Sequence, residues 1–240
     1  MESMKRALVF GAHPDDEIAM SRTIAKLSDI GVEVTVAIMT DGSEGYPSPD
    51  LKDKIAGVRK EEARRCDEVL GVHEHVFLDA PDMGLQNDKP TMQRVIELIR
   101  RLKPDAVFTH GPTDIHRDHV ATHHISMDAC FHAGEPVAVA LGAPWRVPFV
   151  YYHKGVSRPL PEVVIDVTAY REKRLEAQAT QTSQYAVFRM TAEDFANDIA
   201  AAKSAKGACY DRFWLAERSV MTDFLPLDLT ASDQHLRREK

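Results

Sequence analysis

Two short polar segments of the sequence carry the residue types that bind metal ions and move protons. The first, AHPDDE at 12–17, places one histidine beside three acidic residues directly after an apolar run. The second, HRDHVATHH at 116–124, holds four histidines and an aspartate. Carboxylates this close together repel one another unless a cation lies among them. The sequence therefore favours a metal centre or an acid–base site built from both segments.

The elements that must position these segments alternate between strand and helix patterns. Apolar runs predict strands at 6–11, 32–40, 75–79, 105–110, 148–153 and 162–168. Amphipathic patterns predict helices at 17–30, 51–70, 91–102, 169–182 and 192–205. This alternation predicts an α/β fold, a Rossmann-like, mostly parallel sheet with helices on both faces. The last thirty residues show little pattern and are expected to pack over the sheet edge or to fray.

The order of the predicted elements also places the two polar segments together. With no internal repeat and no linker, residues 1–240 are expected to form a single domain. Ligands of open parallel sheets bind beyond the carboxyl ends of the strands. Segments 11–17, 40–46 and 110–119 all follow predicted strands, so they are expected to share one rim of the sheet.

Composition limits the classes of partner. The formal net charge is −7, which argues against a nucleic-acid or membrane-surface binder because both need a basic face. The three cysteines are far apart and form no CxxC pair, which fits a reducing compartment. Neither a signal peptide nor an apolar stretch of roughly 18 residues is present, so a soluble, cytoplasmic protein is expected.

Two other interpretations of the first segment explain less. A dinucleotide-binding turn needs GxGxxG, whereas this turn has one glycine and acids that would repel a phosphate. Simple helix capping accounts for one or two of the acids, and Glu17 is expected to act in this way. Capping does not account for His13 or for the second segment.

A catalytic zinc site accounts for both segments. His13 and Asp16, with a third nitrogen ligand from the second segment, would leave one coordination position open for water. His119 and His123 are four residues apart and could pair on one helix face, but HVATH lacks the glutamate of the HExxH motif. A His₂Asp donor set also accepts Fe²⁺.

AHPDDE followed about a hundred residues later by HRDH resembles the LmbE-like/PIG-L superfamily of zinc-dependent deacetylases, with Arg117 where proline is common. These enzymes remove acetyl groups from N-acetylglucosamine-type sugars. Further similarities are Arg59 with Glu62-Ala63 and Leu70-Gly71, APDMGL at 80–85, and TSQY at 182–185, with Gln181 where a histidine is often found. The resemblance covers about 5–185, which leaves 186–240 to pack on this core.

The resemblance implies a role for each site residue. His13, Asp16 and His119 would hold one Zn²⁺ per chain. Asp15 would be the general base, and His116 would stabilise the oxyanion and protonate the amine. Asp118 would orient one of the histidine rings. Arg59 and Asp82 would face the sugar, and Asp114 lies in a rim loop that could add to these contacts. Members of the superfamily often form trimers or hexamers, so a homo-oligomer is implied as well.

The leading hypothesis is therefore a metal-dependent hydrolase that removes an N-acetyl group from an amino sugar or a related small molecule. A zinc hydratase or lyase acting on an unsaturated acid is one alternative, but it would favour a basic rim and this rim is mainly acidic. A non-catalytic sugar-binding module is the other. Such a module would not need the acid–base pair of Asp15 and His116.

Overall fold

The computed structural model describes residues 4–157 and 159–216. Within these ranges one sheet has the strand order β3-β2-β1-β4-β5-β7-β6. The strands are β1 (Arg6–Gly11), β2 (Glu33–Thr40), β3 (Glu74–Ala80), β4 (Ala106–His110), β5 (Phe149–Lys154), β6 (Glu162–Asp166) and β7 (Tyr210–Leu215). Strands β1 to β5 pair in parallel, and β7 is antiparallel to both of its neighbours. The predicted α/β class is confirmed.

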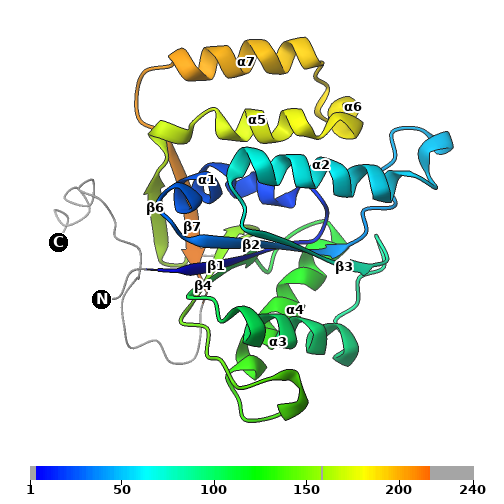
Figure 1. Cartoon of the computed structure of the whole chain (residues 1–240), viewed down its shortest axis with the longest axis vertical. Coiled ribbons are helices and arrows are strands. Elements are labelled where there is room, and N and C mark those ends of the chain that lie inside the picture. Colours follow the sequence, from blue (N-terminus) through cyan, green and yellow to red (C-terminus); the bar gives the residue numbers. More distant parts are fainter. Residues whose placement is uncertain (1–3, 158, 217–240) are drawn as a thin grey trace.

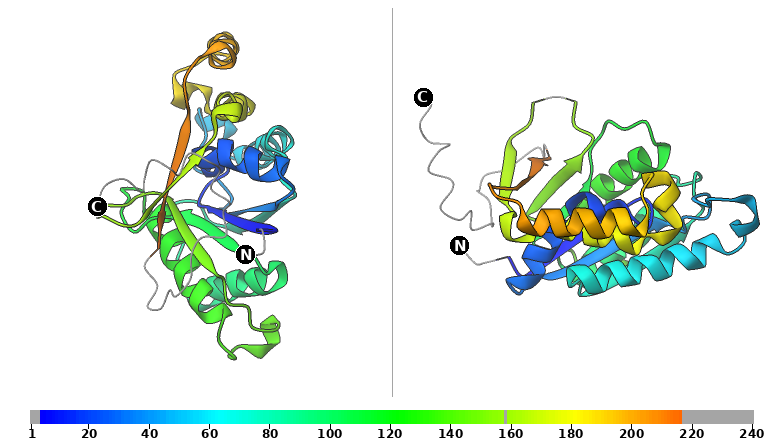
Figure 2. Two further views of the ribbon diagram at one scale, coloured as in Figure 1. Left: turned by 90° about the vertical axis from the view of Figure 1, so that its left-hand side faces the viewer. Right: turned by 90° about the horizontal axis from the view of Figure 1, so that it is seen from above.

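Helices cover both faces of the sheet (Figure 1). One face carries α1 (Ser21–Asp29), α2 (Ile55–Leu70) and α5 (Lys173–Thr180), and the other carries α3 (Lys89–Leu102) and α4 (Arg117–Ala133). The short α6 (Tyr185–Phe188) leads into α7 (Ala192–Ser204), which packs outside α5 (Figure 2). No helix in the described ranges is long and apolar enough to cross a membrane.

The central strands are buried on both faces, as parallel strands between two helix layers must be. Val9 and Val36 belong to the core under α1 and α2. Leu8 and Phe10 belong to the core that α3 and α4 cover. This alternation explains why the strands appear in the sequence as continuous apolar runs.

The first helix begins differently from its prediction. A 3₁₀ turn, Asp16–Met20, precedes α1, and the Glu17 side chain makes no capping hydrogen bond. Glu17 is instead buried, at 1% exposure, with no hydrogen-bond partner for either carboxylate oxygen among the described residues. The predicted capping role of Glu17 is therefore wrong.

Strand β7 is the main feature that the sequence pattern did not predict. It lies inside the sheet, between β5 and β6. Two alternate residues of β7 are buried, Asp211 and Phe213. Phe213 lies in the apolar core, whereas Asp211 accepts hydrogen bonds from Arg22 and Thr23 of α1. A carboxylate at a buried position hides the apolar pattern of a strand. The expectation for residues 217–240 lies outside the described residues.

Candidate active site

The loops after β1, β3 and β4 meet at one rim of the sheet, together with the end of β5. Strands β1 and β4 are neighbours although β2 and β3 come between them in the chain. Strand order therefore reverses between β1 and β4, which is where ligands of doubly wound sheets bind. The loop carrying His13 and Asp16 and the loop carrying His116 and His119 lie on either side of this point.

Asp16 is the centre of the site. Its Oδ2 accepts hydrogen bonds from the backbone N–H groups of Ala12 and His13, both at 2.9 Å. Its Oδ1 lies 3.4 Å from His119 Nε2, and Oδ2 lies 3.5 Å from His13 Nδ1. The three side chains that the family resemblance assigned to zinc are therefore neighbours. Gly11 permits this packing, because a Cβ there would lie 3.0 Å from the Asp16 side chain.

Asp118 is the partner of His13. His13 Nε2 lies 3.3 Å from Asp118 Oδ2 and 3.2 Å from Asp82 Oδ1. Asp118 is completely buried and accepts the backbone N–H groups of Met83 and Leu85. A fixed carboxylate on one ring nitrogen orients a histidine so that its other nitrogen, here Nδ1, can bind a cation.

His119 has a corresponding partner in Asp114. Its Nδ1 lies 2.9 Å from Asp114 Oδ2, which leaves Nε2 facing Asp16. The other oxygen of Asp114 accepts the backbone N–H of His116. In this arrangement the carboxylate of Asp114 is engaged by the protein, which favours a positioning role over the substrate contact expected from its place in a rim loop.

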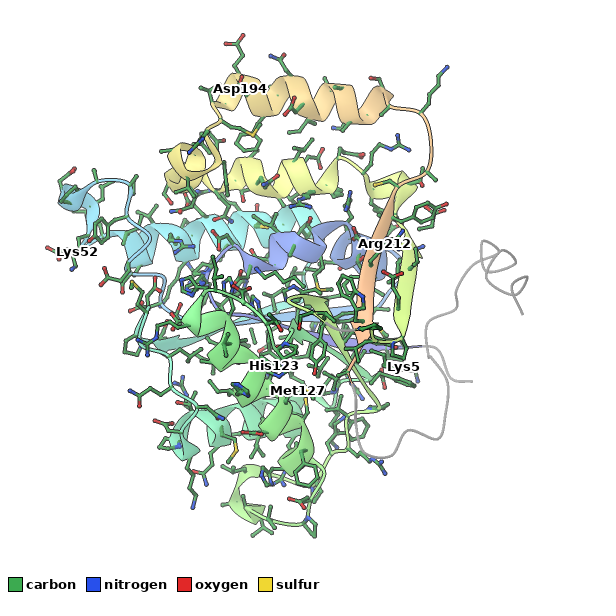
Figure 3. The ribbon with its side chains drawn as sticks, turned by 180° about the vertical axis from the view of Figure 1, so that it is seen from behind. Lys5, Lys52, His123, Met127, Asp194 and Arg212 are labelled. Atoms are coloured by element: carbon green, nitrogen blue, oxygen red, sulfur yellow. The ribbon has the colours of Figure 1, made fainter. Side chains whose placement is uncertain are left out.

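His116 caps the N-terminus of α4 and faces the same space. Its Nδ1 accepts the backbone N–H of Asp118 at 3.2 Å. The proton of its neutral ring must then be on Nε2. The ring centroid lies 4.5 Å from that of His13, in an edge-to-face arrangement. Farther along α4, His123 is buried against the carbonyl of His110 and lies one turn from Met127 (Figure 3), whereas His124 is exposed.

Asp15 pairs with Arg59 of α2. Arg59 Nη2 lies 3.1 Å from Asp15 Oδ2, and the guanidinium also donates to the carbonyls of Gly42 and Pro14. The side chain of Arg59 is 5% exposed. Burial raises the pKa of Asp15, and the Arg59 charge opposes that rise. Arg59 thus holds the carboxylate of Asp15, while its expected sugar contact remains a prediction.

A second helix residue braces the same region. Glu62, fully buried, accepts hydrogen bonds from the Thr182 hydroxyl and from the backbone N–H and hydroxyl of Ser183. Gln184 then donates to the carbonyl of Gly45. The TSQY segment therefore ties α2 to the loop after β2, which contains the carbonyl that Arg59 also binds. Asp82 holds that loop too, by accepting the backbone N–H of Glu44.

The titratable groups of the site perturb one another strongly, and their donor atoms could hold a cation. Burial lowers the pKa of His13, but the carboxylates of Asp16 and Asp82 outweigh that effect and raise it to about 10. Burial raises the pKa of Asp16, but the surrounding histidines and Lys154 lower it well below its usual range. The donor atoms lie in overlapping groups that could hold an ion: His13, Asp16, Asp82, His110, His116, Asp118 and His119. Imidazole nitrogens and carboxylate oxygens are the donors that Zn²⁺ and Fe²⁺ take, so these residues fit a divalent ion.

The sequence analysis did not single out two residues of the site, His110 and Lys154. His110 is fully buried at the end of β4, stacks on His119 at 4.3 Å and places Nε2 3.3 Å from Asp16 Oδ2. Lys154 ends β5, and its Nζ lies 3.2 Å from Asp16 Oδ1. His110 lies in segment 110–119, which was predicted to lie on the rim, so its place in the site could have been predicted. The place of Lys154 could not, because it depends on β5 lying beside β4.

Known proteins resemble this chain in sequence and in fold. The family model "PIG-L: GlcNAc-PI de-N-acetylase" matches residues 8–130. The diacetylchitobiose deacetylase of Thermococcus kodakarensis is 29% identical over 76% of this chain and 71% of its own length. The 1D-myo-inositol 2-acetamido-2-deoxy-alpha-D-glucopyranoside deacetylase of Streptomyces avermitilis is 28% identical over 66% of this chain, which spans 64% of that enzyme.

Solved structures share the fold. The N,N'-diacetylchitobiose deacetylase from Pyrococcus horikoshii has a TM-score of 0.74 at 24% identity, covering 89% of this chain and 84% of that one. GalB, the 4-carboxy-2-hydroxymuconate hydratase from Pseudomonas putida KT2440, has a TM-score of 0.71 at 24% identity, covering 92% and 100%. Because the family model matches more than half of the sequence and both polar segments that form the rim, the chain belongs to the PIG-L family.

Proposed function

We propose that this protein is a zinc-dependent deacetylase that hydrolyses the N-acetyl amide of an amino sugar or a related small molecule. The observation that carries the proposal is the convergence of His13, Asp16 and His119 at one rim, with Asp15 and His116 beside them. The two relatives described above are both deacetylases of N-acetylated amino sugars by name, which supports the same reaction class.

His13, Asp16 and His119 would hold the ion. When bound, a zinc ion would polarise the amide carbonyl of the substrate and lower the pKa of a bound water molecule. Asp118 and Asp114 keep the two histidine rings in the orientation that binding needs. Zinc is preferred over iron here only by the family resemblance, because the donor set accepts both.

Asp15 and His116 would move the protons. Because the side chains of adjacent residues point apart, Asp15 would not bind the ion that Asp16 holds, and its carboxylate would lie beside the bound water to accept a proton from it. Arg59 fixes that carboxylate at 3.1 Å. In its imidazolium form, His116 would donate a hydrogen bond from Nε2–H to the developing oxyanion and then give that proton to the departing amine, which leaves the ring neutral.

The other expected properties are proposed with the function. The substrate is a small molecule, and the chain forms a single domain. Cys66 and Cys130 are buried, Cys209 is partly buried, and none of the three forms a disulfide bond in the described part of the chain, which fits a reducing cytoplasm. A homo-oligomer remains an implication of the family resemblance.

The test is hydrolysis by the zinc-loaded protein. N-acetylglucosamine and N,N'-diacetylchitobiose should each release free amine and acetate in equal amounts, and the Asp15→Asn protein should release far less of both. Lys154 gives the rim a basic residue that a hydratase of unsaturated acids would also use. Hydration of such an acid, with no amine released from either sugar, would replace the proposed function with the hydratase.

A further inference from the structure

The backbone at Lys154 is fixed at the same rim as Asp16. Lys154 pairs with His110 at the ends of β5 and β4. The carbonyl of Lys154 accepts the N–H of Gly111 at 2.7 Å, and the carbonyl of Gly155 accepts the N–H of Thr113 at 2.9 Å. Gly111 packs against these carbonyls so closely that a Cβ would collide with both. The loop that leads to His116 thus holds the start of the Lys154 side chain in one place.

The ammonium group of Lys154 occupies a position that suits a metal ion. Lys154 Nζ lies 3.2 Å from Asp16 Oδ1, the same oxygen that lies 3.4 Å from His119 Nε2. Asp16 Oδ2 is already bound by two backbone N–H groups. A divalent ion held by Asp16 and His119 would therefore compete with the ammonium group for Oδ1 and repel it.

Lys154 would then lose its ion-pair partner. Asp16 is the only side chain that the structure gives it as a hydrogen-bond or ion-pair partner among the described residues. Its side chain is 35% exposed and has a flexible four-carbon stem, so it can turn towards the mouth of the site. Arg59, the other cation beside the acids of the first loop, is already engaged by Asp15 and two carbonyls.

We propose that Lys154 is a specificity-determining residue. In the metal-loaded protein its ammonium group pairs with a carboxylate or phosphate that the substrate carries next to the scissile amide. The neighbouring carboxylates of Asp15, Asp82 and Asp114 would repel such a group elsewhere on the rim, so Lys154 also sets which end of the substrate enters first. The reference to an amide rests on the proposed function, but the recognition of the anion does not require turnover.

The experiment measures binding without hydrolysis. Zinc-loaded Asp15→Asn protein is titrated calorimetrically with N-acetylglucosamine, with N-acetylglucosamine 1-phosphate and with N-succinylglucosamine. The second ligand places the anion on the sugar, and the third places it on the acyl group. At least one of the two should bind about tenfold more tightly than the neutral sugar, because hydrogen bonds to charged groups are the stronger class. Adding Lys154→Met should remove that preference, and adding Lys154→Arg should keep it.

Zinc content provides the second measurement. Lys154→Met should bind zinc at least as tightly as the wild-type protein, because it removes a competing cation, and competition with a chelator measures this. An anion preference that is absent, or that survives in Lys154→Met, would overturn the proposal, and so would loss of zinc in that variant. If no sugar releases amine from the wild-type protein but the Lys154-dependent preference is present, the deacetylase proposal fails and this one stands.

Discussion

Glu17 is a buried acid whose protonation should make the stability of the fold depend on pH. Its carboxyl group is 1% exposed and lies near the buried thiol of Cys66. Burial, together with the charges of Asp15, Asp67 and Asp16, raises the pKa of Glu17 from 4.5 to about 8. The folded protein therefore keeps this proton at pH values where the unfolded chain has lost it.

The sign and size of the effect follow from this difference. The folded state binds more protons between pH 4.5 and about 8, so the free energy of unfolding falls as the pH rises through that range. Stability is fully present below pH 4.5 and stops falling above about pH 8. Each pH unit inside the range costs about 1.4 kcal/mol, so the loss between pH 5 and pH 7 is about 3 kcal/mol.

Glu17→Gln tests this reasoning, because glutamine has the same shape and no charge at any of these pH values. Urea unfolding of metal-free protein should show the variant gaining about 3 kcal/mol relative to the wild type between pH 5 and pH 7. The relative change with pH is the diagnostic quantity, since the buried amide of glutamine adds a cost that is the same at both pH values. Zinc on Asp16 would offset part of the negative charge, so the zinc-loaded protein should show a smaller change.

Glu97→Gln is the matched control, because Glu97 lies on the exposed face of α3. Its stability should follow that of the wild type at every pH. If Glu17→Gln also runs parallel to the wild type, the charge of Glu17 is compensated in the folded protein and the reasoning is refuted.

Other predictions concern the ion, the proton transfers and the packing of α3. His13→Ala should lose bound zinc in elemental analysis; full occupancy would remove His13 from the ligand set. Asp15→Asn should keep zinc and lower kcat by ~10²–10⁴, the usual scale for a general base, whereas loss of zinc would make Asp15 a ligand. His116→Ala should flatten the alkaline limb of the kcat/KM profile, and an unchanged limb would exclude it as the acid. Arg100, 3% exposed, donates to six backbone carbonyls between 132 and 142, so Arg100→Met should cost about 3 kcal/mol of unfolding free energy. The exposed Arg101→Met should change little.

The meeting of the two polar segments could be predicted from the sequence because parallel strands end at a common edge. The apolar runs at 6–11 and 105–110 were enough to place His13, Asp16 and His119 on one rim. Their individual roles came from the family resemblance. The structure adds the distances between them.

The partners of these residues could not be predicted, because they depend on how loops fold over one another. The family resemblance predicted that Asp118 orients a histidine but not which one. It contacts His13, and the loop after β3 holds its carboxylate there with two N–H groups. Arg59 reaches Asp15 past the loop after β2, where any side chain at Gly45 would collide with its guanidinium. The contact of Lys154 with Asp16 depends on β5 lying next to β4 in the sheet. None of these contacts has a signal in residue spacing.

The position of β7 has a consequence for synthesis of the chain. Translation delivers β6 before β7, yet among the described strands β6 pairs with β7 alone. Asp211 of β7 also accepts from Thr23, which lies 188 residues earlier. The nascent chain must therefore hold β1 to β5 and their helices together while the outer edge of β5 is open and β6 has no strand to pair with. Closure over such long sequence distances is slow, and exposed strand edges aggregate during the delay. A ribosome that stalls before residue 210 would thus present a candidate active-site rim that is complete in sequence on a sheet that is still open.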